Sequence, residues 1–155
     1  MGTPLRENEN FVFFRKASFT GGKVAGVTNV DAAVIGTSKF IFVLPKKEMT
    51  SILVAHKIRT FNMGEGVSVE QGAANMLADP QMTVEQLEED LKELLGADNH
   101  DRVIEISQLS HFRVHMLWIL SQARMNHKAG GATKVLSVRG DGGMKRFKAF
   151  YDPKS

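Results

Sequence analysis

Runs of apolar residues predict β-strands at the N-terminal end of the chain. Residues 11–19 are rich in aromatic side chains, residues 23–35 place several apolar side chains on one face, and residues 39–44 are almost entirely apolar. Thr20-Gly21-Gly22-Lys23 predicts a hairpin turn, because glycine readily adopts positive φ angles. Pro45 ends the third strand, because it has no N–H to donate to a sheet. The pattern predicts three antiparallel strands.

Strand signals return in the second half of the chain. Residues 102–106 predict a short strand. Further on, the segments Lys134–Arg139 and Lys145–Tyr151 flank the turn Gly140-Asp141-Gly142-Gly143, which predicts a second hairpin. On its last strand the alternation places Phe147, Ala149 and Tyr151 toward the core and leaves Arg146 and Lys148 outside.

Residues 109–125 fit two structures. In a helix, one face carries Leu109, Phe112, Met116, Leu120 and Ala123. In a strand, apolar residues from Phe112 onward alternate with Arg113 and His115, although only over the first half. A strand is favoured, because it would complete a meander with the predicted hairpin that follows. Residues 49–61 are equally ambiguous, and both alternatives stay open there.

Two helices are predicted in the middle of the chain. Ser68-Val69-Glu70-Gln71 and Thr83-Val84-Glu85-Gln86 both match a capping box, in which a hydroxyl and a Gln side chain satisfy free backbone N–H groups. The first helix should end before Asp79-Pro80, and the second at Gly96. The second helix has an apolar stripe and acidic residues elsewhere; the stripe contains Val84, Leu87, Leu91, Leu94 and Leu95.

Segregated strands and helices predict an α+β fold, with a mainly antiparallel sheet or partly open barrel and two helices inserted in the middle of the chain. We expect one domain over residues 1–155, frayed at residues 1–10, with a helical insertion at residues 46–101. The chain has no cysteine, no transmembrane-length apolar run and no apolar signal-peptide stretch near residue 1. A soluble, cytoplasmic protein is therefore expected.

Charge is segregated along the chain. The net charge is +5 over residues 1–60, −9 over residues 61–105 and +7 over residues 106–155. An acidic helical face between strands edged with lysine would explain this pattern. A basic surface for an anionic lipid, a nucleic acid or an acidic partner is the functional interpretation.

The sequence offers little for catalysis. His111 and His115 lie four residues apart and could share a metal, but no third ligand is apparent and Arg113 lies between them. Neither glycine-rich turn matches a phosphate-binding loop, and no nucleophile motif is present. We expect no metal and no cofactor. A small enzyme with a site assembled from scattered polar residues around His111 and His115 remains the alternative function.

The strand pattern resembles a pleckstrin-homology-like domain of the bacterial or GRAM type. The likeness lies in residues 32–45, where two strands flank a short polar turn, in residues 104–109, and in the last hairpin. It implies a bent pair of antiparallel sheets, usually closed by a C-terminal helix, and an adaptor that binds phospholipid head groups or protein segments. This chain departs from the pattern in its central helical insertion and in residues 152–155, which leave no room for a closing helix.

The leading functional prediction is a non-enzymatic binding or adaptor module for an anionic head group or an acidic protein segment. Nucleic-acid binding ranks third, because a net charge of +3 is a small electrostatic footprint. The expected partner is an acidic protein or an anionic lipid surface. The candidate binding residues are Lys23, Arg139, Lys145, Arg146 and Lys148.

Overall fold

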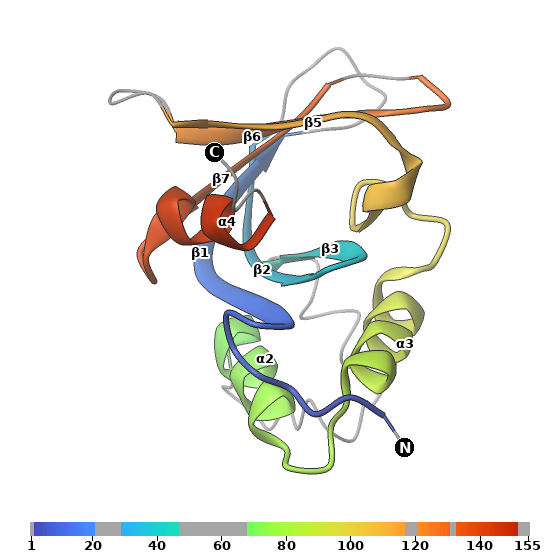
Figure 1. Ribbon diagram of the computed structural model, residues 1–155, viewed down its shortest axis with the longest axis vertical. Helices are drawn as coiled ribbons and strands as arrows, with labels where there is room; N and C mark the ends of the chain where they lie inside the picture. Colours follow the sequence, from blue (N-terminus) through green and yellow to red (C-terminus); the bar gives the residue numbers. More distant parts are fainter. Residues whose placement is uncertain (1, 21–28, 47–67, 117–120, 131–132, 152–155) are drawn as a thin grey trace.

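In the computed structural model, the protein is built around a seven-stranded antiparallel sheet that is curled into a half-barrel (Figure 1). The structure describes residues 2–20, 29–46, 68–116, 121–130 and 133–151. The strand order across the sheet is β4-β3-β2-β1-β7-β6-β5. The strands are β1 (Phe11–Thr20), β2 (Asn29–Thr37), β3 (Phe40–Pro45), β4 (Val103–Glu105), β5 (Leu109–Met116), β6 (Ser121–His127) and β7 (Lys134–Arg139). The predicted α+β class is confirmed.

Three α-helices of the described residues pack on the two faces of this sheet (Figure 1). They are α2 (Val69–Ala78), α3 (Val84–Leu95) and α4 (Gly143–Tyr151); a 3-10 turn, η1 (Ile106–Gln108), follows β4. None of these helices is long and apolar enough to cross a membrane.

The first strands are buried on both faces, which explains why their sequences are continuously apolar rather than alternating. On the inner face of the curl, side chains such as Phe14 and Phe19 form one core with α4. On the outer face, Phe11, Phe13 and their neighbours on β2 to β4 form a second core with α2 and α3. Each of the three predicted N-terminal strands therefore contributes side chains to both cores.

A bulge in β1 lets one strand serve both halves of the sheet. The register with β2 shifts between Phe14 and Ala17, and from Lys16 onward β1 also pairs with β7. A bulge leaves one residue outside the ladder and bends the strand. The backbone N–H of Arg15, in the bulge, donates to the Asp141 carboxylate at 2.8 Å. The bulge therefore bends β1 where the sheet begins to curl, and the backbone N–H that it frees has a hydrogen-bond partner.

Helices α2 and α3 begin and end where the sequence predicts. The hydroxyls of Ser68 and Thr83 accept hydrogen bonds from the N–H groups of Gln71 and Gln86, at 3.1 and 3.2 Å. The Gln side chains do not return to the caps; each donates forward to the residue four positions on. The stripe of α3 is buried apart from Val84, which is half-buried. Gly96 ends α3 with φ of +92°.

The predicted last strand is wrong: residues Gly143–Tyr151 form helix α4. Gly140, Asp141, Gly142 and Gly143 all have positive φ, and this turn redirects the chain over the inner face of the sheet. In the helix, Met144 and Phe147 lie three residues apart on one face and are 4% and 0% exposed. The expectation that no helix follows the last strand is therefore also wrong.

The described residues 109–116 and 121–125 are β-structure, as favoured, but they belong to two strands rather than one. β5 and β6 form a hairpin in which Met116 is paired with Ser121, and β7 completes the predicted meander. The ambiguous residues 49–61 and the glycines of the first predicted hairpin turn lie outside the described residues.

The N-terminal segment contacts the start of α3. Thr3 receives a hydrogen bond from the Val84 N–H at 2.9 Å, and its own N–H donates to Glu85 at 2.9 Å. Hydrogen bonds from the hydroxyl and the N–H of Thr3 lower the pKa of Glu85. A backbone bridge between Pro4 and Thr83 extends the same contact. The start of α3 thus offers hydrogen-bond partners to the segment that the sequence predicts to be frayed, and fraying of residues 1–10 stays a prediction.

Candidate functional site

One half of the outer sheet face has no described helix over it. The outer core with α2 and α3 contains side chains of β1 to β4 only, and none of β5, β6 or β7. Residues on the outer face beyond that core include Lys16 on β1, Asp31 on β2, Arg113 on β5, Arg124 on β6 and Arg139 on β7. All five are exposed. We call this region the open outer face.

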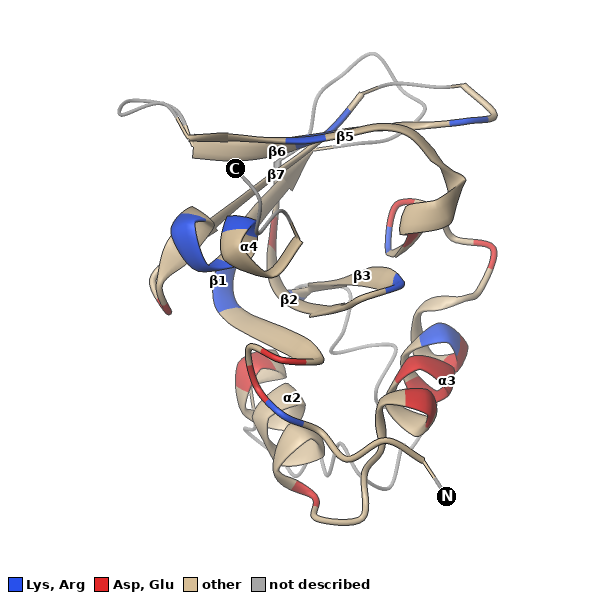
Figure 2. Ribbon diagram, in the orientation of Figure 1, with Lys and Arg blue, Asp and Glu red and all other residues tan. Residues whose placement is uncertain are grey.

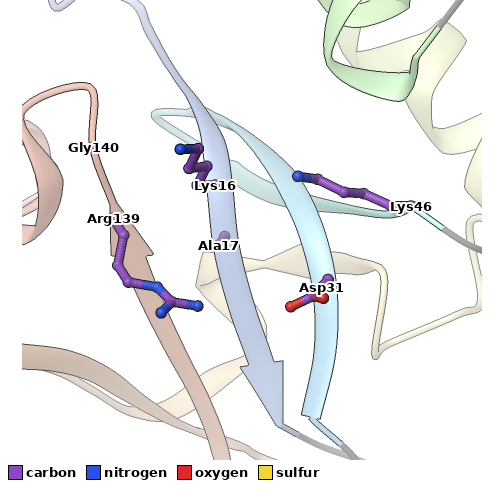
Figure 3. Close-up of a pocket in the computed structure, with 6 residues that line it drawn as sticks. All are labelled: Lys16, Ala17, Asp31, Lys46, Arg139 and Gly140. Atoms are coloured by element: carbon purple, nitrogen blue, oxygen red, sulfur yellow. The ribbon is translucent and has the colours of Figure 1, made fainter.

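A hollow of about 470 Å³ lies in the open outer face, where β7, β1 and β2 run side by side (Figure 3). Its lining residues are Lys16, Ala17, Asp31, Lys46, Arg139 and Gly140. The rim is therefore formed by three strands, β7, β1 and β2, and by Lys46, which directly follows β3. In Figure 3 the charged side chains of Lys46, Asp31 and Arg139 are directed across the same space.

The hollow carries more positive than negative charge. Lys16 and Arg139 are direct register partners on adjacent strands. Like charges in this position repel, since their Cβ atoms lie only about 5 Å apart. Among the described residues no carboxylate forms an ion pair with either side chain, whereas Lys46 lies 3.8 Å from Glu70. Of the described residues, Asp31 is the only acidic one that lines the hollow.

A second pair of cations lies on the same open outer face. Arg113 on β5 and Arg124 on β6 are register partners, and both are exposed. Strands β5, β6 and β7 contain no Asp or Glu. Helix α3, by contrast, contains five acidic residues, and it lies away from β5 and β6 in Figure 2. The charge segregation along the sequence therefore becomes a segregation in space.

Of the five candidate binding residues, the structure brings only Arg139 to the hollow. Lys145 is exposed and Lys148 half-buried on α4, whose core contacts are on the inner face. Lys23 lies outside the described residues. Lys16 and Lys46 were missed, because the fold, not the spacing in the chain, brings them beside Arg139.

Arg146 anchors α4 to the N-terminal segment. Its guanidinium donates to Glu7 at 2.7 Å, to the Asn8 side chain, and to the carbonyl oxygens of Phe13 and Asp141 at 3.1 and 2.7 Å. It also lies 4.9 Å from the centre of the Phe14 ring. The side chain is 19% exposed, so the prediction that Arg146 faces outward is wrong.

We expect Arg146→Ala to lower the free energy of unfolding by about 2 kcal/mol, because hydrogen bonds from a charged donor are lost together. Lys145→Ala, one residue earlier and exposed, should change it by less than about 0.5 kcal/mol. Urea unfolding of both variants measures the difference. Equal effects would show that the Arg146 contacts contribute nothing to stability.

The histidines of the alternative enzyme site lie on the outer face of β5. His111 is exposed, His115 is half-buried, and Arg113 lies between them. No group of three His, Asp or Glu side chains in the described part of the chain is arranged to hold a metal ion.

A buried polar cluster joins α3, the β2–β3 turn and α4. The Thr37 hydroxyl donates to Glu88 at 2.6 Å, and the Tyr151 hydroxyl lies 2.9 Å from the Thr37 carbonyl oxygen and 3.1 Å from that of Phe40. Burial, and to a lesser extent the charge of Glu88, raise the pKa of Tyr151 well above 10.0. Tyr151 therefore remains a hydrogen-bond donor at neutral pH. The cluster positions α4 and offers no open site.

No protein-family model, curated protein or solved structure matches this chain. The case for a function therefore rests on the chain's own residues.

Proposed function

We propose that this protein is a binding module that takes an anionic group into the hollow of the open outer face. The observation that carries the proposal is the register pair Lys16 and Arg139, two neighbouring cations without a described carboxylate partner. A folded protein tolerates such repulsion more readily when an anion binds between the charges. No bond is made or broken in this function.

The dimensions of the hollow favour a compact anion with more than one charge. About 470 Å³ lies within the range of ligand sites, roughly 300–1,000 Å³. Arg139 can bind two oxygens of a phosphate through its planar guanidinium, and Lys16 adds a point charge. Lys46 on the opposite rim supplies a third contact. A phosphorylated head group satisfies this arrangement better than the separated carboxylates of an acidic protein segment.

The architecture supports a pleckstrin-homology-like module. The half-barrel sheet and α4 on its inner face are compatible with such a fold, and α4 removes one of the two departures seen in the sequence. We propose a cytoplasmic location, because anionic lipids are enriched in the leaflet that faces the cytoplasm.

Titration calorimetry with inositol trisphosphate tests the proposal. The wild-type chain should bind this probe at low salt, and the double variant Lys16→Glu, Arg139→Glu should bind it at least about tenfold more weakly, since each exposed cation contributes roughly 1 kcal/mol. A triglutamate peptide, which offers separated carboxylates, should bind more weakly than the phosphate probe.

The control double variant, Lys145→Glu and Lys148→Glu, makes the same change in net charge on α4. It should retain binding. Loss of binding in this control alone would move the site to the α4 lysines that the sequence nominated. Failure of the wild-type chain to bind either probe at low salt would overturn the proposed function.

A further inference from the structure

The outer face of the paired strands β5 and β6 carries one kind of side chain. Every paired residue on this face has a planar polar group: an imidazole, a guanidinium or a carboxamide. The register pairs are His111 with Asn126, Arg113 with Arg124, and His115 with Gln122. A surface that only faces water usually intersperses charges of both signs. The composition of this face therefore points to a ligand.

These planar side chains are accessible from solvent. In Figure 1, α4 lies on one side of β5 and β6, and no described helix lies on the other side. His111, Arg113 and Arg124 are exposed, and the other three residues are half-buried. The Asn126 amide donates to the Thr133 hydroxyl at 3.0 Å. Within the described part of the chain, the other five side chains form no hydrogen bond or ion pair, so they can bind a ligand.

The charge of this face suits phosphate. Arg113 and Arg124 are register partners, so their Cβ atoms lie only about 5 Å apart and the two like charges repel. An anion bound between them relieves that repulsion. The net charge of +3 made nucleic-acid binding a remote prediction from the sequence, but that value averages over the whole chain. The fold gathers cations on strands that contain no Asp or Glu.

Phosphate contacts explain the two arginines but not the neutral amides beside them. A carboxamide presents a donor and an acceptor side by side, which matches the edge of a nucleobase. Imidazole rings and guanidinium planes are surfaces on which unstacked bases stack. An acidic peptide or a lipid head group offers anions without such rings. Because a duplex hides the faces of its bases, the chemistry of this face favours a single strand.

The spacing of the register pairs suits stacked bases. Successive pairs on this face lie two residues apart, or about 7 Å along the strands. Neighbouring bases in a stack lie about 3.4 Å apart, so one base fits between the planes of two successive pairs. The arginine pair lies between the other two. Its guanidiniums can stack on a base on either side and donate to the phosphate that joins the two bases.

We propose that the outer face of the β5–β6 hairpin binds a short single-stranded segment of nucleic acid. Arg113 and Arg124 contact the phosphate between two bases, and the imidazole and amide pairs contact the bases. The inference goes beyond the proposed function and does not depend on the hollow. Val135, the register partner of Arg124, and Arg139 in the hollow lie four residues apart, or about 14 Å along β7.

Fluorescence anisotropy with labelled hexathymidylate tests the inference on the full chain. The wild-type chain should bind this single strand at low salt. An abasic strand with the same number of phosphates should bind at least about tenfold more weakly, because base stacking is lost while the charge is kept. A hexaglutamate peptide, which carries charge without bases, should also bind more weakly.

Two double variants separate the charge of the arginines from their planar groups. Arg113→Glu with Arg124→Glu should weaken hexathymidylate binding at least about tenfold. Arg113→Lys with Arg124→Lys keeps both charges and should still weaken it about fivefold, because the guanidinium planes are lost. The matched control, Lys145→Glu with Lys148→Glu, makes the same charge change as the glutamate variant on α4 and should bind like the wild type. Circular dichroism checks that each variant is folded.

The outcomes judge this site and the hollow separately. Lysine-variant binding equal to that of the wild type, or equal binding of the abasic strand and hexathymidylate, would overturn the inference, because charge alone would then explain binding. Tighter binding of hexaglutamate, or no hexathymidylate binding by the wild-type chain at low salt, would also overturn it. Calorimetry with inositol trisphosphate still judges the hollow. A chain that binds hexathymidylate but neither calorimetric probe would support this inference and overturn the proposed function.

Discussion

Replacing Phe147 with alanine should lower the free energy of unfolding by about 3–5 kcal/mol. Phe147 is fully buried at the centre of the inner core, with ring centres 6.0 Å from Phe14, 6.4 Å from Phe112 and 4.8 Å from Tyr151. Those rings belong to β1, β5 and α4 itself, so the cavity would open where three elements meet. Urea unfolding, followed by circular dichroism, measures the loss.

Met144→Ala is the decisive companion variant, because helix and strand place this residue differently. In α4, Met144 lies on the same face as Phe147 and is 4% exposed, so its truncation should cost about 2–5 kcal/mol. In the hairpin predicted from the sequence, Met144 would share the outward face with Arg146, and the cost would stay below about 0.5 kcal/mol. A negligible effect would contradict helix α4.

The sequence of α4 shows why a local pattern could not settle this element. Phe147 and Tyr151 lie on one face in a strand and also on one face in a helix, because their spacing of four suits both periods. The glycine-rich turn indicated a reversal correctly, but its four consecutive positive φ angles direct the chain across the sheet instead of back along β7. Asp141, within this turn, also accepts a hydrogen bond from the backbone N–H of Arg15 in the distant β1 bulge, a contact that no local pattern indicates.

Elements with several agreeing signals could be predicted. For α3, the Thr83 cap, the leucine spacing and the Gly96 stop all indicate the same twelve-residue helix, and the structure confirms it. Glu88 shows the limit of assigning charged residues to the surface. It lies one turn from Val84 and from Leu91 within the apolar stripe, and the structure buries it against Thr37. The spacing of Glu88 from Val84 and Leu91 therefore already indicated that its side chain lies on the buried face of the helix.

The candidate site could be predicted only in part, because it depends on pairing between distant strands. Arg139 was nominated from its position before a glycine-rich turn. Lys16 joins it through the β1–β7 register, and Lys46 joins from the end of β3. Gly36 shows the same dependence: a side chain there would overlap the Tyr151 hydroxyl, 115 positions along the chain. Contacts between residues so far apart in the chain produce no recognisable pattern in the sequence around either residue.

Leu91→Ala should lower the free energy of unfolding by about 2–5 kcal/mol. Leu91 is fully buried in the outer core, where α3 packs against β3 and β4. Removing most of its side chain forfeits the transfer free energy of the lost groups and leaves a cavity that the rigid sheet cannot fill. Urea unfolding measures the change, with the midpoint and the slope determined separately.

Glu89→Ala is the control on the same helix turn. The Glu89 side chain is 72% exposed and lies 3.0 Å from Lys92 on the same helix. An ion pair with so exposed a carboxylate contributes little, so the loss should stay within about 0.5 kcal/mol. Equal and small losses at Leu91 and Glu89 would mean that the leucine stripe faces solvent. The outer core would then not exist, and α2 and α3 would no longer divide the outer face into a covered half and the open half that carries Lys16 and Arg139.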